Sequence, residues 1–300
     1  MQARQGNVVS IARRKDFENI GTYEESCDYF LFDTKCERAF DATDHLFAES
    51  ILLAAEETRT PVILMVGDFP APVDYDNFYP YLVDRISRTQ VPVCLHFDHG
   101  ASFEACALAV KRGCTSIMID GSALPFEENV ALTKKVVEMA HACNVEVEGE
   151  IGSVGRNESL EGENAVSLYT EPEDAVEFAR LTGVDALAVS IGTVHGVYKK
   201  APKMDFERLA KIRSMIEIPL VMHGGSGLSV EDFHAAVSNG MNKINAFTNL
   251  SIAVADKIVE VSKSLPPKTI TGPIYEAAIE TGKQQVIQHI RLFGTRSIDS

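Results

Sequence analysis

Residues 219–232 read PLVMHGGSGLSVED, which contains in order a short apolar run, a histidine, a glycine-rich turn and the start of a helix. The run Pro219–Met222 has the length of a buried strand, and Ser229 followed by Glu231 and Asp232 is a typical helix-start signal. A strand that passes through a short turn into a helix is the unit from which parallel α/β folds are built. If the unit recurs along the chain, it decides the fold.

Seven further apolar runs alternate with stretches of helical period. The runs are Asp28–Phe32, Pro61–Val66, Pro92–Phe97, Ser116–Ile119, Val145–Ile151, Ala186–Ile191 and Lys243–Phe247. The expected helices cover 43–58, 74–89, 102–112, 125–143, 171–182, 205–215, 229–239 and 249–264. Nearly continuous hydrophobicity is typical of strands that are buried on both faces. Eight strands alternating with eight helices predict a (β/α)8 TIM barrel. A doubly wound open sheet is the alternative, but no Gly-x-Gly-x-x-Gly motif follows the first run.

The whole chain, 1–300, is expected to form a single TIM-barrel domain with additional segments at both ends. Residues 1–26 are polar and charged and predict an extra N-terminal helix that covers the barrel floor. Residues 269–300 predict a C-terminal helix, over 269–293, and a tail. The stretch 153–170 is expected to be a mobile active-site loop, because long loops in compact barrels are commonly lids or binding loops.

The composition narrows the class of protein. The formal net charge is −15 and no basic stripe offsets it, which argues against nucleic acid and anionic membranes as partners. The six cysteines form no Cys-x-x-Cys pair, and the start of the chain lacks the apolar core of a signal peptide. No segment approaches the roughly 18 consecutive apolar residues of a membrane span. We therefore expect a soluble cytoplasmic protein with reduced thiols.

Three histidines lie where predicted strands end, each close to a glycine. His99 follows the third run, His195 the sixth and His223 the seventh. The active-site groups of a (β/α)8 barrel come from the carboxyl ends of the strands, so these imidazoles are expected to converge. Three imidazoles that leave a fourth position open are typical of a catalytic zinc site. His96, on the third run, is expected to be a core or supporting residue instead.

The glycines after His223 predict a second role for the same turn. Gly224–Ser226 precede a helix, so bare backbone amides meet a helix N-terminus, an arrangement that favours phosphate. Barrels often bind phosphate after strands 7 and 8, where Asn245 and Thr248 would complete the cradle. The alternative is a tight turn that simply needs small residues.

Three motifs taken together resemble one known family. They are PVCLHFDHG at 92–100, TGVDALAVSIGTVHG at 182–196, and HGGSG at 223–227, the last followed by KIN at 243–245. In these motifs the chain resembles the class II, metal-dependent ketose-bisphosphate aldolases, and the resemblance covers roughly residues 60–250. It implies a zinc-dependent aldolase that reversibly cleaves a ketose phosphate or bisphosphate to dihydroxyacetone phosphate and an aldehyde, through a metal-stabilised enediolate.

The resemblance also implies the metal ligands. One catalytic Zn²⁺ per subunit would be held by His99, His195 and His223. Asp120 and Glu150 match carboxylates near the metal that in some members touch a second or displaced ion. A monovalent cation such as Na⁺ or K⁺ is a further expected ion, and a homodimer or homotetramer is the expected assembly.

Proton transfer and phosphate binding are assigned in the same way. The resemblance implies that Asp98 handles the proton of the C4 hydroxyl, and that Glu158 in the mobile loop is the general base that acts on the carbanion. The residues implied to bind the phosphate of dihydroxyacetone phosphate are Gly196, Gly224, Gly225, Ser226, Asn245 and Thr248.

Three positions depart from the family pattern. Arg156 stands where the loop usually has a glycine, which makes Glu161 the alternative to Glu158 as the loop base. The first predicted strand ends at Asp33 rather than in an asparagine-containing turn, and Asp68 replaces a serine that typically helps to bind the aldehyde-side phosphate. Because an aspartate would repel a second phosphate, we hypothesise an aldehyde partner that lacks this charge.

Two functions of other kinds stand as alternatives. One is a non-catalytic aldolase-like accessory subunit of a sugar-phosphate pathway, against which the presence of all three histidines and Asp98 argues. The other is a metal-dependent hydrolase on the same barrel, which would be expected to carry His-x-His on the first strand, where Leu31-Phe32-Asp33 has none. A Schiff-base mechanism lacks support, because no lysine ends the fifth, sixth or seventh strand.

Overall fold

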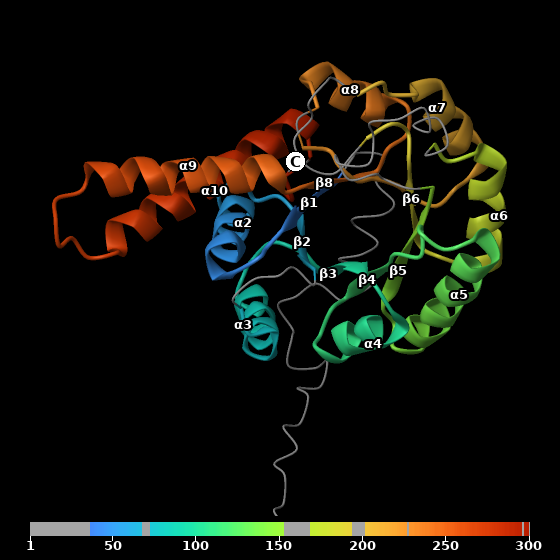
Figure 1. The fold of residues 1–300 in the computed structure, drawn as a ribbon, viewed down its shortest axis with the longest axis horizontal. Helices are drawn as coiled ribbons and strands as arrows, with labels where there is room; N and C mark the ends of the chain where they lie inside the picture. Colours follow the sequence, from blue (N-terminus) through green and yellow to red (C-terminus); the bar gives the residue numbers. More distant parts are fainter. Residues whose placement is uncertain are drawn as a thin grey trace, which may run out of the picture.

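A closed barrel of eight parallel strands forms the centre of the molecule (Figure 1). The computed structural model describes residues 37–67, 73–152, 169–193, 202–226, 228–295 and 297–299. The strands are β1 (Glu37–Asp41), β2 (Val62–Gly67), β3 (Val93–Gly100), β4 (Ser116–Ile119), β5 (Glu146–Ile151), β6 (Ala186–Val189), β7 (Leu220–Met222) and β8 (Lys243–Ala246). Each strand pairs with the next and β8 pairs with β1, so the (β/α)8 barrel predicted from the alternating runs is confirmed.

Helices follow the strands and surround the barrel. They are α2 (His45–Thr58), α3 (Tyr75–Ser87), α4 (Phe103–Lys111), α5 (Phe126–Ala142), α6 (Pro172–Thr182), α7 (Phe206–Met215), α8 (Val230–Ser238), α9 (Thr248–Ser264) and α10 (Gly272–Phe293). The expected starts after Ser102 and Ser229 are correct, since the two side chains accept hydrogen bonds from the amides of Ala105 and Asp232, both at 3.1 Å. Gly183 ends α6 with a φ of 72°, a left-handed conformation that favours glycine.

The position of the first strand was predicted wrongly. The structure places β1 at Glu37–Asp41, and the segment expected to be this strand, Asp28–Phe32, lies outside the described residues. The sequence of β1 is ERAFD, in which only Ala39 and Phe40 are apolar, so it is too short a run to stand out by hydrophobicity. As a result, the residue that ends the first strand is Asp41 and not Asp33. The N-terminal helix expected over 1–26 also lies outside the described residues.

The inner wall of the barrel changes character from one side to the other. On β1 to β3 it is apolar at its lower level, where Ala39, Ile63, Met65 and Cys94 form a buried cluster. On the opposite side, small residues of β6 and β7 (Ala186, Ala188 and Val221) leave room for larger polar side chains. His96, Glu148 and Lys243 are buried in this interior. The inside of the barrel therefore holds a charged network beside its apolar cluster.

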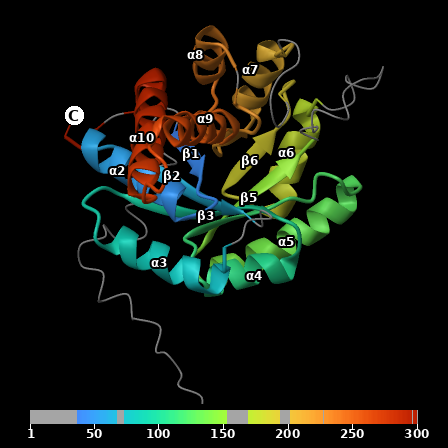
Figure 2. The same ribbon diagram turned by 60° about the vertical axis from the view of Figure 1, so that its left-hand side comes forward.

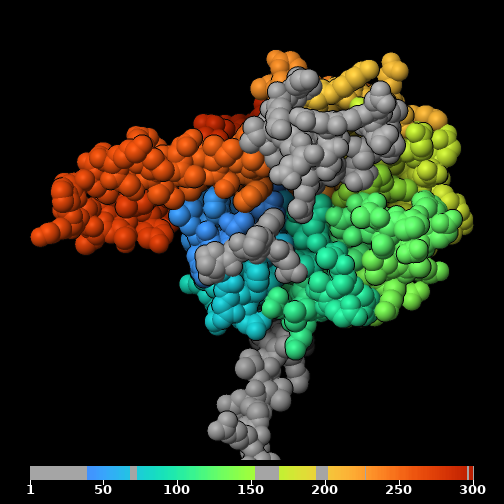
Figure 3. Space-filling view, in the orientation of Figure 1, coloured from blue at the N-terminus to red at the C-terminus, as the bar shows by residue number. Residues whose placement is uncertain are grey.

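Helices α9 and α10 extend beyond the barrel as a helical hairpin (Figures 1 and 3). The C-terminal helix expected over 269–293 is α10, which packs across α2 (Figure 2). A Cβ atom at Gly282 would lie 2.5 Å from the Ser50 hydroxyl oxygen, so glycine is needed for this close approach. The Ser50 hydroxyl also donates a 3.1 Å hydrogen bond to the carbonyl of Ile279.

Two observations concern the predicted cytoplasmic location: the state of the cysteines and the length and polarity of the helices. Of the described cysteines, Cys94, Cys106 and Cys114 are buried and Cys143 is exposed, and all four are free thiols. Burial raises the pKa of the Cys106 thiol to about 12. Within the described ranges, no helix is both long enough and apolar enough to cross a membrane. The cytoplasmic location stays a prediction.

Candidate active site

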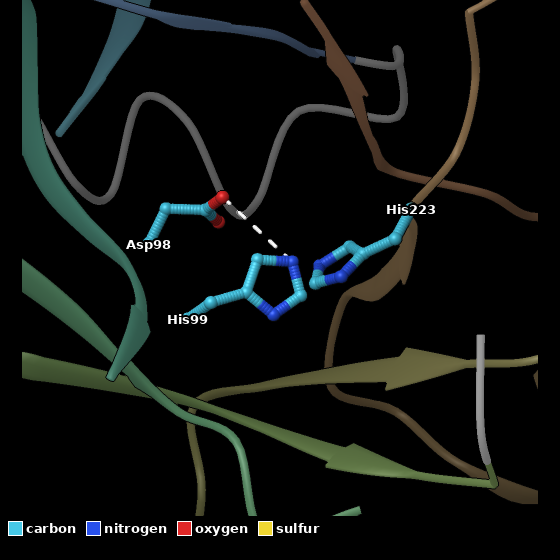
Figure 4. A group of neighbouring side chains, drawn as sticks. All are labelled: Asp98, His99 and His223. Atoms are coloured by element: carbon cyan, nitrogen blue, oxygen red, sulfur yellow. Dashed lines mark ion pairs between the residues drawn. The ribbon is translucent and has the colours of Figure 1, made fainter. Parts of the chain in front are cut away.

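Asp98 and His99 of β3 meet His223, which directly follows β7, at the carboxyl end of the barrel (Figure 4). The Nε2 atom of His99 lies 3.8 Å from Oδ2 of Asp98, and the ring centroids of His99 and His223 are 4.6 Å apart. Asp98 is 3% exposed and His223 is fully buried. Two strands that are far apart in the sequence thus bring three of the predicted site residues together.

An irregularity in β3 lets two consecutive residues face the site. Neighbouring side chains of a regular strand point to opposite faces. His99, however, has a φ of 50°, and the pairing of β3 with β4 shifts register between Phe97 and Gly100. A Cβ atom at Gly100 would lie 2.6 Å from the carbonyl oxygen of Met118, so the residue after His99 has to be glycine. The glycine of the Asp-His-Gly motif is therefore required by the local backbone.

His99 is oriented by the carboxylate of Asp120, the residue that directly follows β4. Its Nδ1 atom lies 2.9 Å from Oδ2 of Asp120, whose other oxygen accepts hydrogen bonds from the amide (3.1 Å) and hydroxyl (2.7 Å) of Ser122. Burial alone would lower the pKa of His99, but the charge of Asp98 and the hydrogen bond with Asp120 outweigh it and raise this pKa. The second ring nitrogen, Nε2, lies on the side of the ring that faces Asp98.

His223 is oriented by carboxylates of β5. Its Nε2 atom lies 2.9 Å from Oε1 of Glu148, and its Nδ1 atom lies 3.3 Å from Oε2 of Glu150. Glu148 also accepts a 2.7 Å hydrogen bond from the buried ammonium group of Lys243. Burial opposes a positive charge on His223, but the two carboxylates outweigh it and raise the pKa of this histidine to about 10. His223 is thus fixed by a buried network that extends to β8.

Sequence reasoning gave no role to Glu148 or Lys243. Glu146, Glu148 and Glu150 alternate along β5, and this period of two is the signal that places all three on the inner face. Neither the contact of His223 with Glu148 nor the hydrogen bond that Glu148 accepts from Lys243 could be predicted from spacing, because these partners lie 75 and 95 residues away in the chain.

His96 has the supporting position expected for it. Its Nδ1 atom lies 2.9 Å from the Ser116 hydroxyl, and its side chain is buried below the site. Burial, assisted by the positive charge of Lys243, lowers the pKa of His96 to about 3, so this histidine is neutral.

The described residues fit a divalent metal ion. In two groups, Asp98–His99–His223 and His99–Asp120–Glu150, the candidate ligand atoms all lie within 4.8 Å of one another. His99 has Nδ1 beside Asp120, and His223 has Nε2 beside Glu148. A carboxylate beside one ring nitrogen is the arrangement that orients an imidazole whose other nitrogen binds a metal ion. Those other nitrogens lie 3.8 Å from Asp98 and 3.3 Å from Glu150, both of which belong to the candidate groups. Imidazole nitrogens combined with carboxylate oxygens suit zinc.

The turn after His223 forms a cradle with the start of α9. Gly224 has a φ of 68°, and a Cβ atom at Gly225 would lie 2.5 Å from the Ile244 side chain. The Ser226 hydroxyl accepts hydrogen bonds from the amides of Phe247 (3.3 Å) and Thr248 (3.1 Å), the first residue of α9. The N-termini of α8 and α9 follow these two turns, and helix N-termini attract anions.

Asn245 links the cradle to the carboxylate of Asp98. Its Nδ2 atom donates a 3.2 Å hydrogen bond to Oδ1 of Asp98. Burial tends to raise the pKa of Asp98, but the positive groups His99, His223 and Lys243 outweigh it and lower this pKa. Asp98 is therefore an ionised carboxylate that can accept a proton from a bound hydroxyl group.

Several expected site residues cannot be placed. The residues that lie outside the described ranges are His195, Gly196, Glu158, its alternative Glu161, Arg156 and Asp68. The residues that the structure does bring together are Asp98, His99, Asp120, Glu150, His223, Gly224, Gly225, Ser226, Asn245 and Thr248.

Comparisons with known proteins agree with this arrangement. The family model of class II fructose-bisphosphate aldolases matches residues 36–297. The fructose-bisphosphate aldolase of Geobacillus stearothermophilus is 41% identical over 267 residues, covering 85% of this chain and 90% of the relative. The probable fructose-bisphosphate aldolase of Bacillus subtilis is 40% identical over 266 residues, with coverage of 85% and 91%. The crystal structure of the YdjI aldolase of Escherichia coli K12 gives a TM-score of 0.80 at 32% identity, covering 92% of this chain and 97% of that one.

Proposed function

The chain belongs to the class II fructose-bisphosphate aldolase family and is an aldolase, a carbon–carbon lyase, and we propose that it cleaves a ketose phosphate reversibly to dihydroxyacetone phosphate and an aldehyde. The observation that carries the proposal is the convergence of Asp98, His99 and His223 beside a glycine turn at the mouth of the barrel. A carboxylate base, a metal centre and a phosphate cradle are the three parts that this reaction requires.

In this proposal His99, His223 and, by resemblance, His195 hold one Zn²⁺ ion in each subunit. Asp120 and Glu150 are the proposed secondary carboxylates, since both lie in the second candidate group with His99. When bound, zinc supplies Lewis-acid polarisation of the ketol oxygens, which is worth several kcal/mol to the developing negative charge. Asp120 and Glu148 keep the two imidazoles in position for it.

Asp98 performs the first proton transfer. As the C3–C4 bond breaks, its carboxylate accepts the proton of the C4 hydroxyl, C4 becomes the aldehyde carbon, and the bonding electron pair stays on the ketone half. The side-chain amide of Asn245 holds the carboxylate in place. Glu158, or alternatively Glu161, then returns a proton to C3, a role taken from the resemblance alone.

The phosphate group of the ketone half binds at the glycine turn. Gly224, Gly225, Ser226 and Thr248 supply backbone amides and hydroxyl groups near the N-termini of α8 and α9. Gly196 is the further phosphate-binding residue that the resemblance implies. Binding here fixes the ketone half beside Asp98, because Asn245 contacts the Asp98 carboxylate directly.

A cleavage assay tests this function. Ketose 1-phosphates and ketose 1,6-bisphosphates are offered to the zinc-loaded protein, and release of dihydroxyacetone phosphate is followed with a coupled reductase. We expect cleavage of at least one compound, loss of activity with a chelator, and recovery when zinc is added back. A zinc-loaded protein that releases no dihydroxyacetone phosphate from any of them, or one that binds no zinc, would instead favour the accessory-subunit alternative.

We also propose a homodimer or homotetramer, with the α9–α10 hairpin in the interface. The hairpin carries exposed apolar side chains, among them Ile270 (78% exposed) and Tyr275 (58% exposed). Exposed apolar groups that gather on one protruding element are typical of association sites. Light scattering of the eluting protein should give a mass of two or four chains, and a single-chain mass would rule the assembly out.

A further inference from the structure

The end of β1 carries an acidic side chain that faces the site and has no role in the proposed reaction. Asp41 pairs in register with Met65 of β2, and the inner-face residue before it on β1 is Ala39 of the interior cluster. Because side chains alternate along a strand, Asp41 lies on the same inner face as Ala39, one step closer to the mouth of the barrel. Its side chain is 5% exposed.

One oxygen of this carboxyl group is available for a ligand. Its Oδ1 atom is buried and has no hydrogen-bond partner among the residues that the structure describes. A buried carboxyl oxygen without a partner is costly, so a group that supplies the missing hydrogen bond gains binding free energy. Burial, followed by the charge of Asp98, raises the pKa of Asp41, while that of Asp98 is lowered. A hydroxyl group is one such ligand, because it can donate a hydrogen bond to the free carboxyl oxygen.

At the level of Asp98, the strand that separates it from β1 contributes no side chain to the inner face. Gly67 of β2 pairs with Asp98 of β3, and it follows Met65, the partner of Asp41, by one inner-face position. Asp98 is also the charged group that acts most strongly on Asp41. The two carboxyl groups therefore lie on neighbouring levels of the inner face, Asp41 beside Met65 and Asp98 beside the bare backbone of Gly67.

The positive groups near Asp41 are already engaged by other carboxylates. His99, Lys243 and His223 are the ones that act on it most strongly. His99 lies beside Asp120, and both Lys243 and His223 bind Glu148. Among the described residues, a phosphate group placed here would meet the carboxyl groups of Asp41 and Asp98 and cations that already have carboxylate partners, so a hydroxyl group is the better ligand.

We propose that Asp41 determines the specificity for the aldehyde half of the substrate, by binding the hydroxyl group on C5, the carbon next to the one whose hydroxyl proton Asp98 accepts. The substrate class is a ketose 1-phosphate whose aldehyde half is hydroxylated and uncharged at this position. The inference rests on the proposed function, because it uses the role of Asp98 to locate C4.

The test pairs one side chain with one substrate hydroxyl. The zinc-loaded protein condenses dihydroxyacetone phosphate with 2-hydroxypropanal or with propanal, which differ only in the hydroxyl group that becomes the C5 hydroxyl. The ratio of the two kcat/KM values is measured for the unchanged protein, Asp41→Ala, Asp41→Asn and the control Asp44→Asn. Asp44 is an acidic residue three positions away that caps α2, a role that asparagine also fills.

We expect Asp41→Ala to lower the ratio of kcat/KM for 2-hydroxypropanal to kcat/KM for propanal by about tenfold or more. Only the value for 2-hydroxypropanal should fall, because the substitution removes the hydrogen bond to its hydroxyl group. Asp41→Asn should keep most of the ratio, since its side-chain oxygen still accepts a hydrogen bond, and Asp44→Asn should leave it unchanged. A ratio that stays within about twofold of the original in Asp41→Ala would overturn the proposal.

A second comparison needs no variant and so does not depend on whether Asp41→Ala folds. The unchanged protein should condense dihydroxyacetone phosphate faster with glyceraldehyde than with glyceraldehyde 3-phosphate, and a preference for the phosphorylated aldehyde would overturn the proposal. Activity with either aldehyde leaves the proposed function intact, whereas condensation with no aldehyde at all would contradict that function and this inference together.

Discussion

The two sides of the barrel mouth differ in whether their charged groups are already paired within the protein, although Oε2 of Glu150 and Oδ1 of Asn245, on the side of β3 to β8, also have no hydrogen-bond partner among the described residues. On the side of β3 to β8, His99 is held by Asp120, and His223 and Lys243 are held by Glu148. On the side of β1 and β2, the Oδ1 atom of Asp41 has no hydrogen-bond partner among the described residues, and Gly67 offers no side chain.

This difference separates the chemistry from the choice of substrate. Groups that stabilise developing charge are most effective when the fold fixes them before the substrate arrives. The side proposed to bind the metal ion and the phosphate group is built in this way, and in the proposed function it binds the half of the substrate that every reaction of this site would share. The side of Asp41 is completed only by a ligand, so it is where the aldehyde is selected.

Removing a metal ligand from the fixed side should have the largest effect. We expect His99→Ala to lose bound zinc and to lower kcat/KM for cleavage by roughly 10³-fold or more, equivalent to about 4 kcal/mol. Zinc content by mass spectrometry and the cleavage assay check this. The control is His141→Ala, because His141 is an exposed histidine that lies beside Asp185 and outside the site. Full activity in His99→Ala would break the distinction between the two sides.

Replacing the proposed general base, Asp98, should have the second-largest effect on activity. Asp98→Asn should lower kcat by about 10²- to 10⁴-fold, the usual contribution of a general base, while zinc content stays the same. The asparagine preserves the shape but cannot take the proton of the C4 hydroxyl. Parallel loss of zinc would indicate that Asp98 acts as a ligand instead, since its Oδ2 atom is 3.8 Å from His99 Nε2.

The buried network behind His223 should have a smaller effect on activity and a separate effect on stability. Glu148→Gln is expected to weaken zinc binding about 10- to 100-fold, as loss of the group that orients a ligand does. It also leaves Lys243 buried without its ion-pair partner, which costs about 3–5 kcal/mol of unfolding free energy. Adding Lys243→Met should recover part of the stability but not the zinc affinity. Denaturant melts and zinc titrations separate the two, and strictly additive effects would contradict the network.

The smallest predicted effect belongs to the phosphate cradle. Ser226→Ala removes the acceptor of the amide hydrogen bonds from Phe247 and Thr248, so the start of α9 is less well fixed. We expect a rise of about 5- to 10-fold in KM for dihydroxyacetone phosphate with little change in kcat, because each such bond is worth about 1 kcal/mol. Thr269→Ala serves as the control, since its exposed hydroxyl donates a hydrogen bond to the nearby Pro266 carbonyl, in the segment between α9 and α10. A change in kcat alone would place Ser226 in the chemistry rather than in binding.

The alternation of apolar runs and helices was enough to predict the barrel, and strand-end histidines were enough to predict where Asp98, His99 and His223 lie. The first strand was misplaced because β1 has only two apolar residues, and Asp41 was missed with it. The roles of Glu148 and Lys243 were not predicted for another reason. Their partners are set by the closure of the barrel, which brings together residues far apart in the chain, and local pattern carries no information about that closure.

The location of zinc in crystals of the loaded protein tests the central claim most directly. Anomalous diffraction at the zinc edge should show one ion about 2.0–2.1 Å from Nε2 of His99 and from Nδ1 of His223, with Asp120 and Glu148 still beside the other nitrogens. An ion bound elsewhere, or imidazoles that have turned away from these carboxylates to reach it, would contradict the claim that the fold fixes this side of the site in advance.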